Sequence, residues 1–224
     1  MVKRSARPPI ERAVLVTGFE PFGGATTNPS ECVARALDGQ TIGGRSVVAA
    51  VLPCVFDDSR RALVRAIARA RPELVVCVGE AGGRAEISVE RVAINVDDAR
   101  IPDNAGAQPI DRAVVTRGPV AYWSSLPIKA IVAALHAEKI AAAVSQSAGT
   151  FVCNHVFYAL MHALRDRHGV RGGFVHVPYL PEQVIARPGI PSMALAQATR
   201  ALEIVIATSL ATRADSLIVG GATH

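Results

Sequence analysis

Leu74-Val-Val-Cys-Val78 is an unbroken apolar run that ends at Gly79. A short apolar run closed by a turn former is typical of a strand that is covered on both faces of a sheet. The segment before it, from Asp57 to Arg71, carries Leu63, Val64 and Ile67 on one helical face and arginines on the other. This spacing predicts an amphipathic helix that packs on the sheet. A helix followed directly by a buried strand indicates an α/β domain.

The same alternation continues in both directions along the chain. Apolar or alternating runs predict strands at 13–17, 46–52, 86–96, 140–144 and 173–177. Helical spacing predicts further helices that start at Pro29 and Pro127 and that span 151–167 and 192–211. Residues 86–96 alternate between apolar and polar, so we expect a half-exposed strand there, and 97–126 should form a long structured loop. This order predicts a single-domain, three-layer α/β/α sandwich around a mainly parallel mixed sheet.

Composition and charge narrow the class of protein. Hydrophobic residues make up 50% of the 224 residues and charged residues 19%, which suits a large core and argues against a disordered chain. No apolar run approaches the roughly 18 residues of a membrane span, so we expect no membrane partner. The net charge is +5, and the one dense basic stretch lies at the N-terminus. This stretch contains no aromatic residue that could stack on a base, and the chain has no nucleic-acid recognition motif, so we expect no nucleic-acid partner.

We expect one domain at 13–212, flanked by a flexible basic tail at 1–12 and a C-terminal tail at 213–224. The basic tail is not followed by the apolar stretch of about 7–15 residues that a secretory signal requires. The four cysteines form no Cys-x-x-Cys motif, and a chain with a large core does not need disulfides. We therefore expect a reducing, cytoplasmic location.

Cys153 is the first candidate for a nucleophile. The loop Ser147-Ala-Gly-Thr150 precedes it, and an apolar helix begins within one or two residues of it. A cysteine in the first turn of a helix lies at the positive end of the helix dipole, which favours the reactive thiolate. The alternative interpretation is a small, buried and unreactive apolar residue.

His176 is the candidate base for Cys153. It ends the apolar strand in Gly172-Gly-Phe-Val-His-Val-Pro178, and we expect this strand end to share a sheet edge with the loop before Cys153. His155 lies about 200° further around the helix than Cys153 and cannot face the same side. The alternative role for His176 is a core histidine bonded to a backbone carbonyl. Cys153 and His155 alone lack the four ligands that zinc needs, so we expect no metal.

A carboxylate should orient the imidazole of His176. Glu90 begins an extended segment, Glu90-Arg-Val-Ala-Ile-Asn95, that would project its carboxylate over the site. Residue type and spacing alone do not choose among the five acidic candidates, which are Glu80, Glu90, Asp97, Asp98 and Asp103.

Aromatic residues gather in the predicted loops. Phe19 and Phe22 lie in Gly18-Phe-Glu-Pro-Phe-Gly-Gly24, and Phe151 lies beside Cys153. They suit either the walls of an apolar ligand pocket or plugs in the core. The loop lacks the glycine spacing of nucleotide-binding loops, so we expect no nucleotide cofactor.

Several of these segments together carry a family resemblance. They are Gly18-Phe-Glu-Pro-Phe-Gly-Gly24 with Asn28-Pro-Ser30, Gly82-Gly-Arg84, Glu90-Arg-Val-Ala-Ile-Asn95, Asp98-Ala-Arg-Ile-Pro-Asp-Asn104, Leu126-Pro-Ile-Lys129, Ser147-Ala-Gly-Thr-Phe-Val-Cys-Asn-His155 and His176-Val-Pro-Tyr-Leu-Pro-Glu-Gln183. From about residue 13 to residue 210 the chain resembles the pyroglutamyl peptidase I family of cysteine peptidases, also called pyrrolidone-carboxylate peptidases.

The resemblance implies a function and an assembly. The domain at 13–212 would be a catalytic domain with a phosphorylase/hydrolase-like fold. It would act as an exopeptidase that hydrolyses the N-terminal pyroglutamyl residue from peptides and amides through a thioester acyl-enzyme. The partners implied are N-terminally pyroglutamylated peptides and further copies of the chain in a homotetramer, with no cofactor.

The resemblance also assigns roles residue by residue. Cys153 matches the nucleophile, His176 the general base and Glu90 the acid of the family. Arg100 is implied to hold the oxyanion together with the backbone N–H of Cys153. The substrate-binding positions implied for the pyroglutamyl ring are Phe19, Phe22, Glu80, Ile101, Phe151 and Val152.

Two residues depart from the family pattern. Glu80 stands where Gln or Leu is common, and Cys54 stands where Thr is common. An ionised Glu80 beside the neutral ring would lower substrate affinity. A nucleoside phosphorylase or related transferase and a catalytically silent binding module are the alternative functions, because a fold does not by itself fix a function. A reactive Cys153 paired with His176 distinguishes the peptidase from both.

Overall fold

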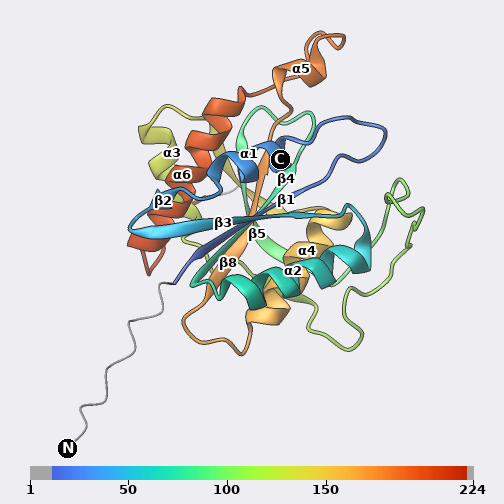
Figure 1. Ribbon diagram of the computed structural model, residues 1–224, viewed down its shortest axis with the longest axis horizontal. Coiled ribbons are helices and arrows are strands. Elements are labelled where there is room, and N and C mark those ends of the chain that lie inside the picture. The colour runs from blue at the N-terminus through green and yellow to red at the C-terminus, as the bar shows by residue number, and fades with distance from the viewer. Residues whose placement is uncertain (1–11, 221–224) are drawn as a thin grey trace, which may run out of the picture.

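The computed structural model describes residues 12–220, so the predicted basic tail lies outside the described residues except for Arg12. An eight-stranded mixed sheet forms the middle layer. Helices α1, α3 and α6 cover one face of it, and α2 and α4 cover the other (Figure 1). The predicted three-layer α/β/α sandwich is confirmed.

The predicted strands and helices are all present, with ends that shift by a few residues. The strands are β1 (Val14–Phe19), β2 (Thr41–Ile42), β3 (Arg45–Leu52), β4 (Leu74–Glu80), β5 (Ile87–Ile94), β6 (Ala121–Trp123), β7 (Ala142–Ser147) and β8 (Arg171–Val177). The helices are α1 (Pro29–Leu37), α2 (Phe56–Ala70), α3 (Ile128–Ala137), α4 (Val152–Leu164), α5 (Pro181–Val184) and α6 (Leu195–Ala211). The sequence did not predict β2, β6 and α5, because elements this short show no periodicity.

The order of the strands is β2-β3-β1-β4-β8-β5-β6, and β7 also pairs with β5. Neighbours among β3, β1, β4 and β8 are parallel, whereas β5 runs antiparallel to β8 and β7 runs parallel to β5. The carboxyl ends of β7 and β8 therefore point in opposite directions. The expectation that both strands end at one sheet edge is wrong, because apolar periodicity does not encode strand direction.

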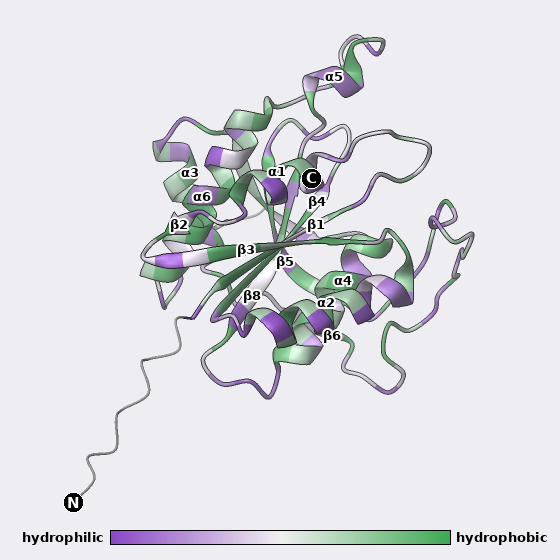
Figure 2. Ribbon diagram, in the orientation of Figure 1, coloured by the Kyte–Doolittle hydropathy of each residue, from purple (hydrophilic) through white to green (hydrophobic). Residues whose placement is uncertain are grey.

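Alternation along the strands divides the apolar residues between two cores. Val76 and Val175 belong to the core under α1, α3 and α6. Cys77 and Phe174 belong to the core under α2 and α4. Figure 2 shows hydrophobic colour along the central strands and hydrophilic colour on outer turns of α2. This division places every second residue of β8, including His176, on the α4 side of the sheet.

β5 is an interior strand of the sheet. Its first four residues, Ile87 to Glu90, are buried, so the expectation of a half-exposed strand is wrong. Its neighbours β7 and β8 cover its edges. The polar residues Ser88 and Glu90 alternate with apolar ones although both are buried, and the Glu90 carboxylate bonds to other polar side chains rather than to water.

The described part of the predicted C-terminal tail packs against the domain. The carboxylate of Asp215 accepts hydrogen bonds from the backbone N–H groups of Lys129 (3.1 Å) and Ala130 (3.0 Å) at the start of α3. Arg91 donates a hydrogen bond to the carbonyl of Gly220. Among residues 12–220, no helix has both the length and the apolar character needed to cross a bilayer.

Asn28 ties the start of α1 to the loop after β1. Its Oδ1 accepts hydrogen bonds from the backbone N–H (3.0 Å) and the hydroxyl (2.8 Å) of Ser30, and its Nδ2 donates to the carbonyl of Glu20 (3.1 Å). The Ser30 hydroxyl oxygen accepts a hydrogen bond from the N–H of Phe19 (3.0 Å). Gly18 completes the junction, since a β-carbon there would lie 2.2 Å from the Ser30 carbonyl oxygen. These contacts fix the loop that carries Phe22.

Asn28→Ala is expected to lower the free energy of unfolding by about 1–2 kcal/mol, because it removes a helix cap. It also leaves buried polar groups of Ser30 without their partner. Urea denaturation followed by circular dichroism measures the loss. Asn28→Ser keeps a capping oxygen and should lose less. Equal losses in the two variants, or no loss in Asn28→Ala, would contradict the capping role.

Candidate active site

Cys153 is the second residue of α4 and lies against β4. A β-carbon built on Gly79 would lie 2.8 Å from the Cys153 Sγ, so the sulfur occupies space that a side chain at residue 79 would need. The neighbouring Asn154 holds the start of α4 against the end of β5. Its side chain accepts a hydrogen bond from the N–H of Ile94 (3.0 Å) and donates to the carbonyls of Ile94 and Val96 (both 2.9 Å). Position 79 must therefore be glycine for the thiol to stand here.

His176 lies next to the thiol on the adjacent strand. In the pairing of β4 with β8, His176 is directly opposite Gly79, above which the sulfur lies. Phe174 lies two residues earlier on the same face, and its ring would also lie 2.8 Å from a β-carbon on Gly79. The centres of the Phe174 and His176 rings are 4.9 Å apart. Directly paired residues of neighbouring strands are about 5 Å apart, so thiol and imidazole are neighbours.

Glu90 contacts the imidazole of His176 at its Nδ1 atom. Its Oε1 lies 2.7 Å from His176 Nδ1, and its side chain is completely buried. A carboxylate only accepts hydrogen bonds, so Nδ1 carries the proton and Nε2 is left free to accept one. Of the five acidic residues that the sequence left open, the structure brings Glu90 to His176.

Arg84 is a contact of Glu90 that sequence reasoning missed. Its Nη1 donates hydrogen bonds to Glu90 Oε1 (3.2 Å) and to the Ser145 hydroxyl (3.3 Å). The guanidinium thus places a positive charge 3.2 Å from a buried carboxylate and ties the turn after β4 to β5 and β7. The signal that could have found Arg84 is its place at the end of the glycine-rich turn after β4.

The other acidic and histidine candidates are engaged elsewhere. His155 faces away from Cys153, as its helical angle predicts, and its Nδ1 lies 3.0 Å from both carboxylate oxygens of Asp97. Asp103 accepts a hydrogen bond from the N–H of Phe56 (3.0 Å). The backbone N–H of Asp98 donates to the carbonyl of Thr150 (2.9 Å), and the Thr150 hydroxyl donates to the carbonyl of Asp98 (2.7 Å). These last bonds tie the segment that carries Arg100 to the loop before Cys153.

Burial dominates the electrostatics of the thiol. It raises the pKa of Cys153 well above its ordinary value, and Cys54 and the carboxylates of Glu90 and Glu80 raise it further. The cysteine does lie in the first turn of a helix, but the dipole that we expected to favour the thiolate is outweighed. Ionisation of Cys153 therefore depends on a neighbour that takes the proton, and His176 is the base in position.

A cavity of about 730 Å³ is bordered by Glu80, the residue that follows Gly79 in β4, and neither Cys153 nor His176 is among its lining residues. Phe22, Glu80, Arg100 and Ile101 line it, together with Tyr179, Gln183 and Arg187. Phe151, at the start of α4, packs at 6.0 Å on the Phe22 ring and at 5.4 Å on the Phe56 ring. Phe19 and Val152 are buried in the core, 2% and 1% exposed, and do not line this cavity. The structure thus brings together part of the predicted ring pocket, and the roles of Phe19 and Val152 stay a prediction.

Glu80 is held at the wall of this cavity by a residue that sequence reasoning did not single out. Gln183 Nε2 donates a hydrogen bond to Glu80 Oε2 (2.8 Å), and Gln183 Oε1 accepts one from the N–H of Leu180 (2.8 Å). Burial raises the pKa of Glu80, although the bond from Gln183 acts in the opposite direction. Because of the raised pKa, Glu80 takes up a proton more readily than an exposed glutamate does. A protonated Glu80 lessens the loss of substrate affinity that we expect from an ionised carboxylate beside the neutral ring.

The chain is similar to one family over almost its whole length. The family model described as pyroglutamyl peptidase matches residues 12–212. The pyrrolidone-carboxylate peptidase of Klebsiella pneumoniae (strain 342) is 59% identical over 211 residues, which cover 94% of this chain and 99% of the relative. That of Cupriavidus taiwanensis is 58% identical over 214 residues, with coverage of 94% and 99%.

Solved structures agree with this similarity. Pyroglutamyl peptidase I from Bacillus amyloliquefaciens superposes with a TM-score of 0.88 at 48% identity, covering 92% of this chain and 100% of that one. Pyrrolidone carboxyl peptidase from Thermococcus litoralis superposes with a TM-score of 0.90 at 39% identity, covering 93% and 99%.

His176→Gln is expected to slow alkylation of Cys153 by iodoacetamide at neutral pH by about ten-fold or more, because no base then takes the thiol proton. Mass spectrometry of the peptide that contains Cys153 follows the reaction. His168→Gln, at an exposed histidine after α4, should leave the rate unchanged. An unchanged rate in His176→Gln would show that the imidazole does not control the thiol.

Proposed function

The chain belongs to the pyroglutamyl peptidase family and is a cysteine peptidase that removes N-terminal pyroglutamate, and we propose that Cys153, His176 and Glu90 carry out this reaction. One observation carries the assignment of residues. The Cys153 sulfur lies above Gly79, Gly79 pairs with His176, and His176 Nδ1 lies 2.7 Å from Glu90. The relatives named above are all peptidases, so neither a transferase nor a silent binding module is supported.

The first step is transfer of the Cys153 proton to Nε2 of His176 as the sulfur attacks the substrate carbonyl. Glu90 stabilises the imidazolium that forms and keeps its Nδ1 proton in place. Arg84 is a positioning residue, because it acts on the reaction through its hydrogen bond to Glu90. Since burial and nearby carboxylates disfavour a free thiolate, the proton moves in concert with the approach of substrate.

Attack on the carbonyl that joins the pyroglutamyl ring to the next residue gives a tetrahedral oxyanion. The N-terminus of α4 has no side-chain cap, which supports the backbone N–H of Cys153 as a donor to this oxyanion. Arg100, on the cavity wall, is the proposed second donor. One donor of this kind contributes about 2.7–4 kcal/mol to transition-state stabilisation.

Collapse of the oxyanion expels the amine, which takes the proton from His176, and leaves a thioester between pyroglutamate and Cys153. A water molecule then gives its proton to His176 and attacks the thioester. The second collapse releases pyroglutamate, and the returning proton restores the thiol. The chemistry is balanced by one water molecule for each peptide cleaved.

The ring of the substrate is a small neutral lactam without a free α-amine, so shape and backbone-type hydrogen bonds must recognise it. We assign its apolar face to Phe22 and Ile101, which line the cavity that Glu80 borders, and to Phe151, which packs on the Phe22 ring. Phe19 and Val152 support this wall from the core. Glu80 is assigned to the polar edge of the ring.

Location and assembly are part of the same proposal. All four cysteines are free thiols, which supports a reducing, cytoplasmic location. Exposed apolar side chains at Val120, Trp123, Leu217 and Val219 support a homo-oligomer, proposed to be a tetramer. No nucleic-acid partner is proposed.

Purified protein should release the fluorescent amine from a pyroglutamyl amide, and Cys153→Ser should reduce release to the background rate, because an alcohol is a far weaker nucleophile than a thiol in this setting. The matching alanyl amide should not be cleaved. Cys32→Ser, at a partly exposed cysteine of α1, serves as the control and should retain activity. Undiminished release by Cys153→Ser would remove Cys153 from the mechanism.

Glu90→Gln is expected to lower kcat by about a hundred-fold or more while KM changes little, because the amide neither stabilises the imidazolium nor fixes its tautomer. Steady-state kinetics with the same amide measure both constants, and circular dichroism checks that the variant folds. A folded Glu90→Gln enzyme with normal kcat would contradict the role of Glu90.

A further inference from the structure

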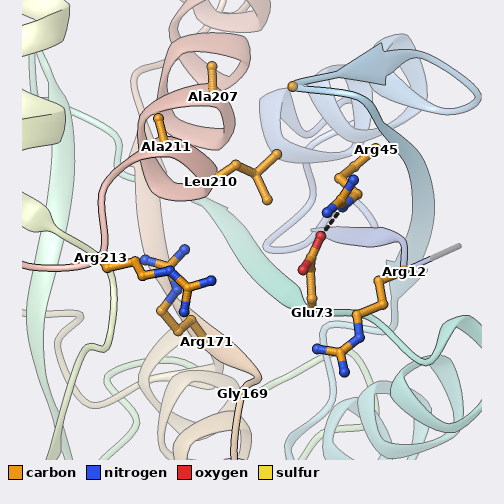
Figure 3. Close-up of a pocket in the computed structure, with 10 residues that line it drawn as sticks. Arg12, Arg45, Glu73, Gly169, Arg171, Ala207, Leu210, Ala211 and Arg213 are labelled. Carbon is orange, nitrogen blue, oxygen red and sulfur yellow. Dashed lines mark hydrogen bonds and ion pairs between the residues drawn. The ribbon is translucent and has the colours of Figure 1, made fainter.

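A second cavity lies at the end of the sheet opposite to Cys153, where the parallel strands begin. Arg12 precedes β1, Arg45 begins β3, Arg171 begins β8, and Arg213 follows α6. All four line a cavity of about 340 Å³. Figure 3 shows Arg171 and Arg213 on one side of this cavity and Arg45 and Arg12 on the other.

One carboxylate faces these four guanidinium groups. Glu73, which precedes β4, forms an ion pair with Arg45, and it is the only acidic residue among the described residues that line the cavity. Arg171 is fixed in place by hydrogen bonds to the carbonyls of Thr212 (2.7 Å) and Ser209, neither of which carries a charge. The positive charge of the cavity is therefore largely uncompensated.

The basic surface, defined by Arg12, Arg45, Arg171 and Arg213, continues beyond this cavity. An adjoining cavity of about 300 Å³ shares Arg12 and adds Arg71, Arg167 and His168, with no acidic residue in the part of its lining that the structure describes. Like charges held together disfavour one another, and burial together with the Arg213 charge lowers the pKa of Arg171. An anion bound among these groups would remove that repulsion.

The lining and volume of the cavity indicate which kind of anion it would bind. Planar guanidinium groups bind phosphate oxygens through paired hydrogen bonds. The volume is more than ten times the roughly 30 Å³ that a water molecule occupies in the liquid, so several linked phosphates fit. No aromatic residue is among its described lining residues, which argues against stacked bases of a nucleic-acid strand. Ala207, Leu210 and Ala211 of α6 close the remaining side.

We propose that this cavity binds an oligophosphate group, either as inorganic tripolyphosphate or as the triphosphate of a nucleotide. The bound group would link the starts of β1, β3 and β8 to the end of α6. Because the active site lies at the other end of the sheet, binding would not compete with substrate. The ligand would also stabilise the folded protein, since it binds that state and not the unfolded chain.

Isothermal titration calorimetry with sodium tripolyphosphate at low ionic strength tests the proposal. We expect one saturable site, weaker binding of inorganic phosphate, and binding that falls steeply with added salt. Arg12→Ala and Arg213→Ala should each weaken binding about ten-fold, the loss of one charge-assisted hydrogen bond. Arg65→Ala, on an exposed turn of α2, removes the same charge elsewhere and should leave the affinity unchanged.

A parallel titration with ATP distinguishes the two sources of the group. Equal affinity for ATP and tripolyphosphate would show that the phosphates alone are recognised, and tighter binding of ATP would favour a nucleotide. Thermal unfolding of each variant without ligand separates lost binding from lost folding. The proposal is overturned by the lack of saturable binding at low salt, by equal effects of Arg65→Ala and Arg213→Ala, or by displacement of tripolyphosphate by free pyroglutamate.

Discussion

The close approach of the Cys153 sulfur to the backbone of Gly79 is the contact on which the site depends. A β-carbon at residue 79 would lie only 2.8 Å from the sulfur, so α4 can begin at this place on β4 only because residue 79 has no side chain. The register of β4 with β8 then places His176 beside the thiol, and that of β5 with β8 brings Glu90 behind the imidazole. Three segments far apart in the sequence thus meet through backbone pairing.

The burial of the site also determines how readily the Cys153 thiol ionises. Desolvation and two nearby carboxylates make the half-buried thiol resist ionisation, so the pKa of Cys153 is raised. Ionisation of the thiol therefore depends on the imidazole of His176, which takes the Cys153 proton when the substrate carbonyl arrives. Glu90 is completely buried, and its Oε1 is shared by His176 and Arg84.

The sequence predicts the helices and strands better than it predicts the direction of the strands and the contacts between distant side chains. Continuous apolar runs such as Leu74 to Val78 identify buried strands, and the Asn28-Pro29 pair marks the start of α1 correctly. The direction and burial of β5 could not be predicted, because Ser88 and Glu90 alternate with apolar residues whether they face water or other polar groups. Contacts such as Arg84 with Glu90 and Gln183 with Glu80 depend on long-range pairing. The resemblance to a family pointed to Glu90 where residue spacing left five acids open.

The central claim is that one sulfur, next to an imidazole and beside a cavity for the lactam ring, is the nucleophile. Labelling with a diazomethyl ketone of pyroglutamate tests it most directly, since the ring guides the reagent and only an activated thiol displaces nitrogen from it. Peptide mass spectrometry should find one label per chain, on Cys153 and on none of Cys32, Cys54 and Cys77, and free pyroglutamate should slow its attachment. A label on another residue, or no label on an enzyme that turns over substrate, would contradict the account.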